Sequence, residues 1–336
     1  MTETNFHSTL PKQAVLVTGG AGFIGSHLVD RLLAAGKRVV CLDNFSTGTK
    51  RNLEQALQNP NFTLISGDIR HYETCRKAVE GISYIFHHAA LGSVPRSIHN
   101  PVPTNEVNVG GFVNMLTAAK EAGVKRFIYA ASSSTYGNHQ GLPKVEELIG
   151  QPLSPYAVSK YVNELYAQVF GQVYGMETIG LRYFNVFGER QDPEGAYAAV
   201  IPRFIKALIN GESPLINGDG NHSRDFTYIE NAVQANLLAA ATEKPEAINQ
   251  TFNVAYGQAT TLNKLMDHLR ELLSPYRPEV RFIPTHYGPE RAGDIPHSLA
   301  SIDKARKLLG YHPEFSIREG LQKTVEWFFE NSLAQR

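Results

Sequence analysis

The chain has 336 residues, with 32 lysine and arginine residues against 32 aspartate and glutamate residues, and 42% of it is hydrophobic. This length and composition predict about two domains with a buried core and exclude a disordered chain. The balanced charge argues against a nucleic-acid partner and against a membrane-surface protein.

Targeting signals and cysteine content suggest where the protein resides. Residues 1–13 are polar, so we expect a flexible N-terminus without a secretion signal, and no run of about 20 apolar residues predicts a membrane span. Two cysteines, Cys41 and Cys75, are too few for a disulfide framework. We therefore expect a cytoplasmic protein.

Short β-branched runs alternate with helical spacing between residues 14 and 183. Strands are expected at 14–17, 38–42, 62–65, 84–86, 126–129 and 178–182, and helices at 23–35, 107–122 and 156–174. This alternation predicts an α/β fold with a Rossmann-type, doubly wound parallel sheet.

Glycine and proline become frequent after about residue 184. Helices are expected at 201–210, 262–273, 302–309 and 317–330, separated by short strands and long loops. We predict a smaller C-terminal α/β lobe over 184–336 that covers the first domain of 14–183. No clear linker marks the boundary, so some segments of the two regions are expected to interleave.

A glycine-rich turn follows the first predicted strand and opens the first helix. Gly19, Gly22 and Gly25 lie where the backbone must turn tightly and approach a pyrophosphate, which the helix N-terminus would bind. Asp43 follows Gly25 by 18 residues, at the end of the second strand. A carboxylate there accepts from the ribose hydroxyls of NAD and repels the extra phosphate of NADP. The alternative for Asp43 is a turn or cap residue.

The third and fourth strands also end in residues suited to a ligand crevice. Asp68 ends the third, and the small residues Ala89 and Ala90 follow the fourth. For His87 and His88 we expect that one packs inward and the other points away. No other histidine or cysteine has ligand spacing, so no metal site is predicted.

The motif from Tyr156 to Lys160 carries the clearest chemistry. Ser154 is a good N-cap and Pro155 a good first helical residue, so Tyr156 falls in the first turn with Lys160 one turn later. We predict that the ammonium and the helix dipole lower the tyrosine pKa, which suits proton removal from a hydroxyl. Ser132 at the end of the fifth strand would bind the reacting oxygen, the alternative being a polar loop.

These motifs resemble the extended short-chain dehydrogenases/reductases, specifically the nucleotide-sugar 4-epimerases. The resemblance covers TGGAGFIG (18–25), DNFSTG (43–48), GDIR (67–70), HAA (88–90), SSSTYG (132–137), YAVSK (156–160), LRYFNVFG (181–188), SRDF (223–226) and RAGD (291–294). ALGSVPRSI (90–98), AYAAVIP (196–202) and INGDG (216–220) are similar to the UDP-N-acetylglucosamine 4-epimerases of bacterial surface-polysaccharide pathways.

The resemblance implies roles for individual residues. Ser132, Tyr156 and Lys160 would be catalytic. The expected NAD contacts are Gly19, Gly22, Phe23, Ile24, Gly25, Asp43, Asn44, Asp68, Ile69, Ala89, Ala90, Asn108, Tyr156, Lys160 and Tyr183. The expected UDP-sugar contacts are Ser93, Arg96, Ser132, Ser133, Ser134, Asn185, Val200, Leu215, Ile216, Arg224, Arg291 and Ser298. The C-terminal lobe would therefore bind the UDP-sugar.

The resemblance also implies a reaction. Ser133 and Ser134 stand where related dehydratases carry an acid pair, and decarboxylases a glutamate at the second position, so epimerisation at C4 through a 4-keto sugar is expected. The small Ser298 would leave room for an N-acetyl group and favour UDP-GlcNAc and UDP-GalNAc. Rival interpretations are a UDP-glucuronate 4-epimerase, with Arg96 and Ser133 on the carboxylate, and a non-catalytic NAD-binding sensor or scaffold. Helices 107–122 and 156–174 resemble the family's dimer interface, so a homodimer is expected.

Overall fold

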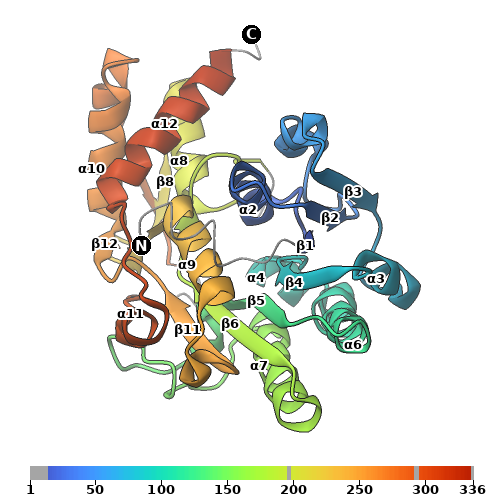
Figure 1. The fold of residues 1–336 in the computed structure, drawn as a ribbon. Coiled ribbons are helices and arrows are strands. Elements are labelled where there is room, and N and C mark those ends of the chain that lie inside the picture. The colour runs from blue at the N-terminus through green and yellow to red at the C-terminus, as the bar shows by residue number, and fades with distance from the viewer. Residues whose placement is uncertain (1–13, 195–197, 291–294, 334–336) are drawn as a thin grey trace.

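The protein is described by a computed structural model over residues 14–194, 198–290 and 295–333. At its centre lies a seven-stranded sheet in the order β11-β6-β5-β4-β1-β2-β3 (Figure 1). All neighbouring strands in it are parallel. The strands are β1 (Ala14–Thr18), β2 (Val39–Asp43), β3 (Phe62–Ser66), β4 (Ile82–His87), β5 (Arg126–Ser132), β6 (Glu177–Tyr183) and β11 (Gln250–Val254). The predicted Rossmann-type fold is confirmed.

The sheet is covered by helices on both faces, which explains why its strands lack polar alternation. All five residues of β1 are buried, as expected for a central parallel strand. One face carries α2 (Phe23–Ala34) and α9 (Ile229–Ala241), and the other carries α3 (Tyr72–Ala78), α6 (Phe112–Glu121) and α7 (Pro155–Tyr174). Strand order reverses between β1 and β4. Ligands of such sheets bind at that switch point.

The connection from β4 to α6 is helical throughout most of its length. It contains α4 (Val94–His99), α5 (Pro101–Asn105) and a π-helical turn, Glu106–Gly111, that continues into α6. Both α4 and α5 pack against α7. This places the loop after β4 beside the start of α7.

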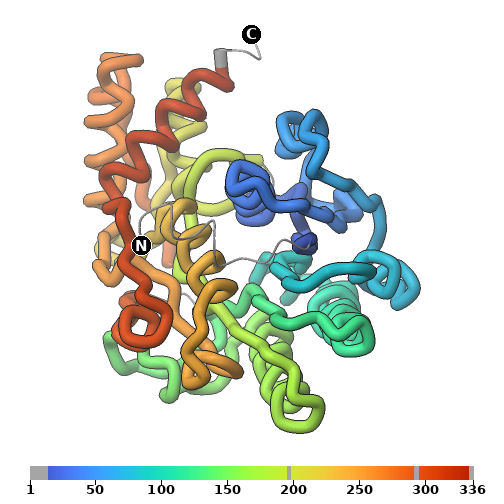
Figure 2. The backbone as a smooth tube through the Cα atoms, in the orientation of Figure 1, coloured from blue at the N-terminus to red at the C-terminus, as the bar shows by residue number. Residues whose placement is uncertain are grey.

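The second lobe is built on helices α8 (Val200–Asn210), α10 (Leu262–Leu273) and α12 (Ile317–Leu333), which pack together (Figure 2). Short strand pairs join it: β7 (Val186–Phe187) with β10 (Thr227–Tyr228), β9 (Ser223–Asp225) with β12 (Ala259–Thr261), and β8 (Leu215–Asn217) with β13 (His286–Gly288). Helix α11 (Asp303–Leu309) precedes α12 in the chain. Among the described residues, no helix combines the length and apolar character needed to cross a bilayer.

Two elements from beyond residue 184 complete the first domain, and sequence analysis placed neither. Strand β11 forms the sheet edge beside β6, and α9 packs against β5 and β6. The apolar core under α2 and α9 continues without a break into the second lobe. Segments from both sides of residue 184 therefore share one sheet and one core, while the division into two interleaved domains stays a prediction. The N-terminal residues 1–13, expected to be flexible, lie outside the described residues.

Candidate active site

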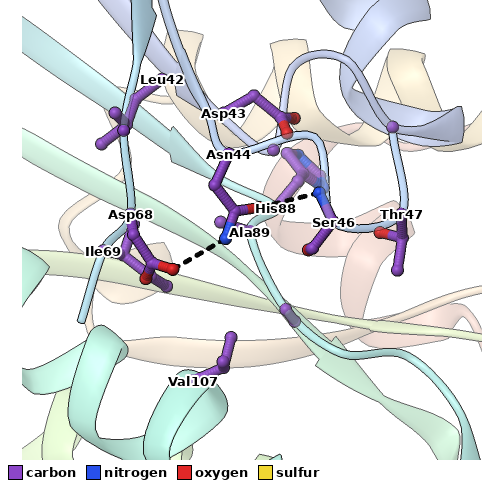
Figure 3. Close-up of a pocket in the computed structure, with 14 residues that line it drawn as sticks. Leu42, Asp43, Asn44, Ser46, Thr47, Asp68, Ile69, His88, Ala89 and Val107 are labelled. Carbon is purple, nitrogen blue, oxygen red and sulfur yellow. Dashed lines mark hydrogen bonds between the residues drawn. The ribbon is translucent and has the colours of Figure 1, made fainter. Parts of the chain in front are cut away.

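A pocket opens at the carboxyl ends of β1 to β4, at the switch point of the sheet (Figure 3). Eight predicted cofactor contacts line it: Gly19, Gly22, Asp43, Asn44, Asp68, Ile69, Ala89 and Ala90. Six further lining residues were not predicted: Leu42, Ser46, Thr47, Gly67, His88 and Val107. Most of these neighbour a predicted residue in the chain, so the strand ends themselves would have indicated them.

The glycine turn forms the floor of this pocket. Gly19 has a φ of +69°, and a Cβ there would lie 2.6 Å from the Ala89 nitrogen. A Cβ on Gly25 would lie 2.2 Å from the Gly19 oxygen, so this glycine permits close packing of α2 on the turn. Helix α2 begins after Gly22 with no side-chain cap and no acidic residue in its first turn. Its first amides, including those of Phe23 and Ile24, therefore suit a diphosphate.

Asp43 closes the pocket at the end of β2. Its Oδ2 accepts from the Ala21 nitrogen at 2.9 Å and its Oδ1 from the Phe45 nitrogen at 2.8 Å. Asp43 thus has the turn role that sequence analysis held as the alternative. Each carboxylate oxygen retains a further lone pair, so a ribose hydroxyl fits as well.

Asn44, next to Asp43, reaches across to Asp68 in the same pocket (Figure 3). The Asn44 Nδ2 donates to the Asp68 Oδ2 at 2.8 Å, and the Ser46 nitrogen donates to the Asn44 Oδ1 at 3.0 Å. Hydrogen bonds from Arg70 hold the pKa of Asp68 down at about 2. The pocket therefore offers an ionised acceptor to an amino group. The diphosphate end and the ribose acid together fit NAD.

The start of α7 has the predicted capping. The Ser154 Oγ accepts from the Ala157 nitrogen at 3.1 Å, and Pro155 occupies the first turn. The Ser97 hydroxyl of α4 accepts from the Tyr156 nitrogen at 3.0 Å. These bonds fix the first turn of α7 against the loop after β4.

Tyr156, Lys160 and Ser132 come together at the end of β5. The Lys160 Nζ, on a side chain buried to 3% exposure, donates to the Ala130 oxygen at 2.8 Å. Burial lowers the pKa of Lys160 to about 8. Burial raises the pKa of Tyr156, and a hydrogen bond with Ser132 offsets this in part. The predicted net lowering of the Tyr156 pKa by Lys160 is wrong in this structure, because loss of hydration outweighs the stabilising contacts.

Two residues predicted to contact the cofactor, Asn108 and Tyr183, form hydrogen bonds to other parts of the protein. The Asn108 Oδ1 accepts from the Leu91 nitrogen at 2.7 Å and its Nδ2 donates to the Ser159 Oγ at 3.1 Å. Asn108 therefore ties the loop after β4 to α7. The Tyr183 hydroxyl accepts from the Asn236 Nδ2 at 2.7 Å, and burial raises the pKa of Tyr183.

The two adjacent histidines make different contacts. His87 packs against Phe112 and Phe127, and its Nδ1 lies 2.9 Å from the Thr18 hydroxyl. The His88 Nε2 lies 3.2 Å from the Asn236 Oδ1, and burial lowers the pKa of His88 to about 4. His87 is buried, whereas His88 is only partly buried and lines the pocket, so the two rings have different surroundings. Within the described ranges, no three His, Cys, Asp or Glu side chains are grouped to hold a metal ion.

The predicted substrate residues lie on several loops above the sheet. The Ser93 Oγ caps α4 by accepting from the Arg96 nitrogen at 3.2 Å. Ser133 and Ser134 lie in a short 3-10 helix, Ser133–Tyr136, directly after β5. They therefore begin one residue beyond Ser132, at the same sheet edge.

The second lobe provides the other predicted substrate residues. The Asn185 Nδ2 donates to the Asp225 oxygen at 3.2 Å, the Arg224 Nη1 to the Pro296 oxygen at 3.1 Å, and the Ser298 nitrogen to the Ser223 oxygen at 3.0 Å. Val200 is the first residue of α8. These bonds join three of the predicted residues through β9.

The two residues expected against the uracil differ in exposure. Leu215 is 46% exposed, whereas Ile216 is 1% exposed and belongs to the core. The Ile216 side chain therefore cannot contact a base, because neighbours on β8 point to opposite sides. Arg291 lies outside the described residues.

The comparisons with known proteins agree with this geometry. Residues 15–255 match the NAD dependent epimerase/dehydratase family. A putative UDP-glucose 4-epimerase of Methanocaldococcus jannaschii is 37% identical over 320 residues, which cover 95% of this chain and 99% of the relative.

Two solved structures are also similar. A UDP-N-acetylglucosamine 4-epimerase from Methanobrevibacter ruminantium, in complex with UDP-N-acetylmuramic acid, is 40% identical with a TM-score of 0.89, covering 96% of this chain and 100% of that one. A UDP-glucuronic acid 4-epimerase from Bacillus cereus, in complex with UDP-glucuronic acid and NAD, is 30% identical with a TM-score of 0.86, covering 95% and 99%. The family match over residues 15–255 and these relatives show that the chain belongs to the NAD dependent epimerase/dehydratase family, within the extended short-chain dehydrogenases/reductases.

Proposed function

We propose that the protein is a UDP-sugar 4-epimerase that interconverts UDP-GlcNAc and UDP-GalNAc, for surface-polysaccharide precursors. The observation that carries this proposal is the placement of Ser132, Tyr156 and Lys160 at the end of β5, beside the NAD pocket. The similarity to 4-epimerases named for acetylated and plain sugars supports the reaction type. A non-catalytic sensor would not need this complete set.

The residues divide the chemistry between them. Tyr156 takes the proton of the sugar 4-hydroxyl, Ser132 donates to the same oxygen, and Lys160 provides positive charge near the phenol. NAD held by the glycine turn and Asp43 would supply a reversible hydride acceptor for C4, so that the hydride could return to the other face of the 4-keto sugar. Tyr156 then gives its proton back to the new alkoxide, so neither protons nor electrons are gained or lost overall.

Inversion requires the sugar to turn while the nucleotide stays anchored. We assign the anchor to the second lobe, where Arg224 would pair with the diphosphate and the exposed Leu215 would contact the uracil. Arginine suits this role because its forked donors match phosphate oxygens. Binding energy on the unreactive nucleotide then holds the substrate through the turn.

The acetylated sugar is the preferred substrate in this proposal because Ser298 is small. Its nitrogen donates to the Ser223 oxygen, which places it beside β9 and the proposed diphosphate site. Ser298→Tyr should lower kcat/KM for UDP-GlcNAc by at least about tenfold more than for UDP-glucose, since the bulk removes space for the N-acetyl group. Equal losses on both sugars would remove this argument.

One product assay tests the function as a whole. The purified protein, with no NAD added, is incubated separately with UDP-GlcNAc, UDP-glucose and UDP-glucuronate, and the C4 epimers are separated. We expect UDP-GalNAc as the fastest product and a loss of at least about 100-fold in kcat for Tyr156→Phe. No epimer from any sugar, in protein shown to contain NAD, would favour a sensor or scaffold.

The uronate epimerase is the second candidate. The similar Bacillus cereus enzyme acts on UDP-glucuronic acid, and Arg96 lies on α4, whose Ser97 bonds the Tyr156 nitrogen. A cation there could bind a carboxylate. UDP-galacturonate as the fastest product would select this candidate.

We also propose a homodimer located in the cytosol. The residues on the solvent side of α7 are largely apolar, as expected of a helix that pairs with a second copy. Both Cys41 and Cys75 are free, buried thiols, which suits a reducing compartment.

A further inference from the structure

The catalytic serine receives two hydrogen bonds from one neighbour. The Ser134 nitrogen lies 3.1 Å from the Ser132 Oγ, and the Ser134 Oγ lies 2.8 Å from the same atom. Ser132 ends β5 in an extended conformation and caps the 3-10 helix that contains Ser134. The short turn therefore brings both donors of Ser134 onto one oxygen.

A serine oxygen has two lone pairs and one proton. The backbone N–H of Ser134 must use one lone pair, since it can only donate. If the Ser134 hydroxyl donates too, both lone pairs are occupied and the Ser132 proton has to point to a third partner. The Tyr156 phenol is the expected partner, because burial raises the pKa of Tyr156 and an interaction with Ser132 lowers it in part.

We propose that Ser134 is a positioning residue that fixes the proton of Ser132 toward Tyr156 and the sugar 4-oxygen. This inference rests on the proposed epimerase function, in which Ser132 and Tyr156 share the reacting proton. It adds to the substrate contact that the family resemblance implies for Ser134, because the hydroxyl now acts through Ser132.

The arrangement also strengthens Ser132 as a donor. A hydroxyl that accepts hydrogen bonds becomes polarised and donates more strongly, above all where burial lowers the local dielectric. Ser132 is 9% exposed. Its bond stabilises the phenolate form of Tyr156 and so opposes the rise in that pKa caused by burial.

A hydrogen bond donated by the Ser132 hydroxyl to the Ser134 hydroxyl would make the opposite prediction. If Ser132 donated to Ser134, the proton would be turned away from Tyr156. Removing the Ser134 hydroxyl would then release that proton and leave the rate unchanged or raise it. The sign of the effect of one substitution therefore distinguishes the two arrangements.

The test compares Ser134→Ala and Ser134→Thr with the unaltered enzyme. We expect Ser134→Ala to lower kcat by about tenfold, as for loss of a hydrogen bond near a charge, with KM changed less than about twofold. The acid limb of its kcat–pH profile should move to higher pH, because the phenolate is less stabilised. Ser134→Thr keeps the hydroxyl and should restore both the rate and the limb.

The controls separate this inference from misfolding and from the proposed function. Ser332→Ala removes a hydroxyl that donates to the Phe329 oxygen on α12 and should leave kcat unchanged, while melting temperature and NAD content check each variant. A Ser134→Ala enzyme with unchanged kcat and acid limb, or a Ser134→Thr enzyme as slow as Ser134→Ala, would overturn the inference. An unaltered enzyme inactive on all three sugars would instead overturn the proposed function.

Discussion

Lys160 is the residue whose ionisation should limit activity in alkali. Its ammonium is buried beneath α7 and bonded to the Ala130 oxygen, and burial lowers its pKa to about 8. In the proposed mechanism the protonated form is the active one, because its positive charge would favour the phenolate one helical turn away and oppose the effect of burial. Activity should therefore fall as the pH rises through about 8.

A kcat–pH profile from about 6 to 10 checks this prediction. Lys160→Arg supplies a charge that does not titrate in this range, so whatever activity it retains should lack the alkaline limb. A profile of the unaltered enzyme that stays flat to about pH 9.5 would contradict the assignment.

For single residues, the sequence predicts contacts within one motif better than contacts between residues that are far apart in the chain. Gly19, Asp43 and Asp68, which are predicted to contact NAD, line one pocket, because each sits at a strand end that the sequence pattern locates. The bond between His88 and Asn236 joins residues 148 positions apart. No local spacing indicates such a partner, and the same holds for the burial that raises the pKa of Tyr156.

Strand β9 is held in place by one buried carboxylate. Asp225 is fully buried and accepts from the nitrogens of Tyr256 at 3.2 Å, Gly257 at 3.1 Å and Ala300 at 3.2 Å. It thereby joins β9 to the loop after β11 and to the segment before α11. Arg224 and Ser298, two proposed substrate contacts, lie beside these junctions.

The ionisation of Asp225 has a cost in stability. Burial raises its pKa from 3.8 to about 6, so between these values the folded state binds more protons than the unfolded state. Its contribution to stability is then greatest below pH 4 and is lost as the pH rises through 6, at about 1.4 kcal/mol per pH unit and about 3 kcal/mol in all.

Asp225→Asn removes this titration. The difference in melting temperature, variant minus unaltered protein, should therefore be more positive at pH 7 than at pH 4.5. This holds whether the difference at pH 4.5 is positive or negative. Asp219→Asn is the matched control, because hydrogen bonds from Asn221 lower the pKa of that exposed carboxyl. The same melting difference for Asp225→Asn at both pH values would show that the carboxyl is not held as described.

The elements that sequence analysis missed share a physical cause. Eleven of the 13 residues of α9 are buried, so it has no polar face to reveal a helical period. Helices with one solvent-exposed face, such as α10, show that period, and the predicted bounds of α10, 262–273, match the structure. The edge of the sheet and the cover of one face therefore depend on β11 and α9, whose sequences do not show the periodic pattern of a particular element.

The whole molecule exposes an apolar stripe that a second copy would cover. Along α7 the stripe consists of the exposed apolar side chains of Val158, Leu165, Tyr166, Val169 and Val173. Their spacing places them on one side of the helix, while the opposite side, with Lys160 and Glu164, is buried against the sheet. Ile98 and Val102, on the α4–α5 segment that packs on α7, extend the stripe at 62% and 63% exposure.

Val169→Glu should convert the proposed dimer into a monomer, because a dimer interface would bury the new carboxylate without a partner. Light scattering after gel filtration should give the mass of two chains for the unaltered protein and of one chain for this variant. Gln168→Glu adds the same charge one residue away, outside the stripe, and should remain a dimer. Since Lys160 faces the sheet, the monomer should still bind NAD, which would attribute the change to the interface. An unaltered protein with the mass of one chain, or a dimeric Val169→Glu variant, would show that this stripe is not where two copies meet.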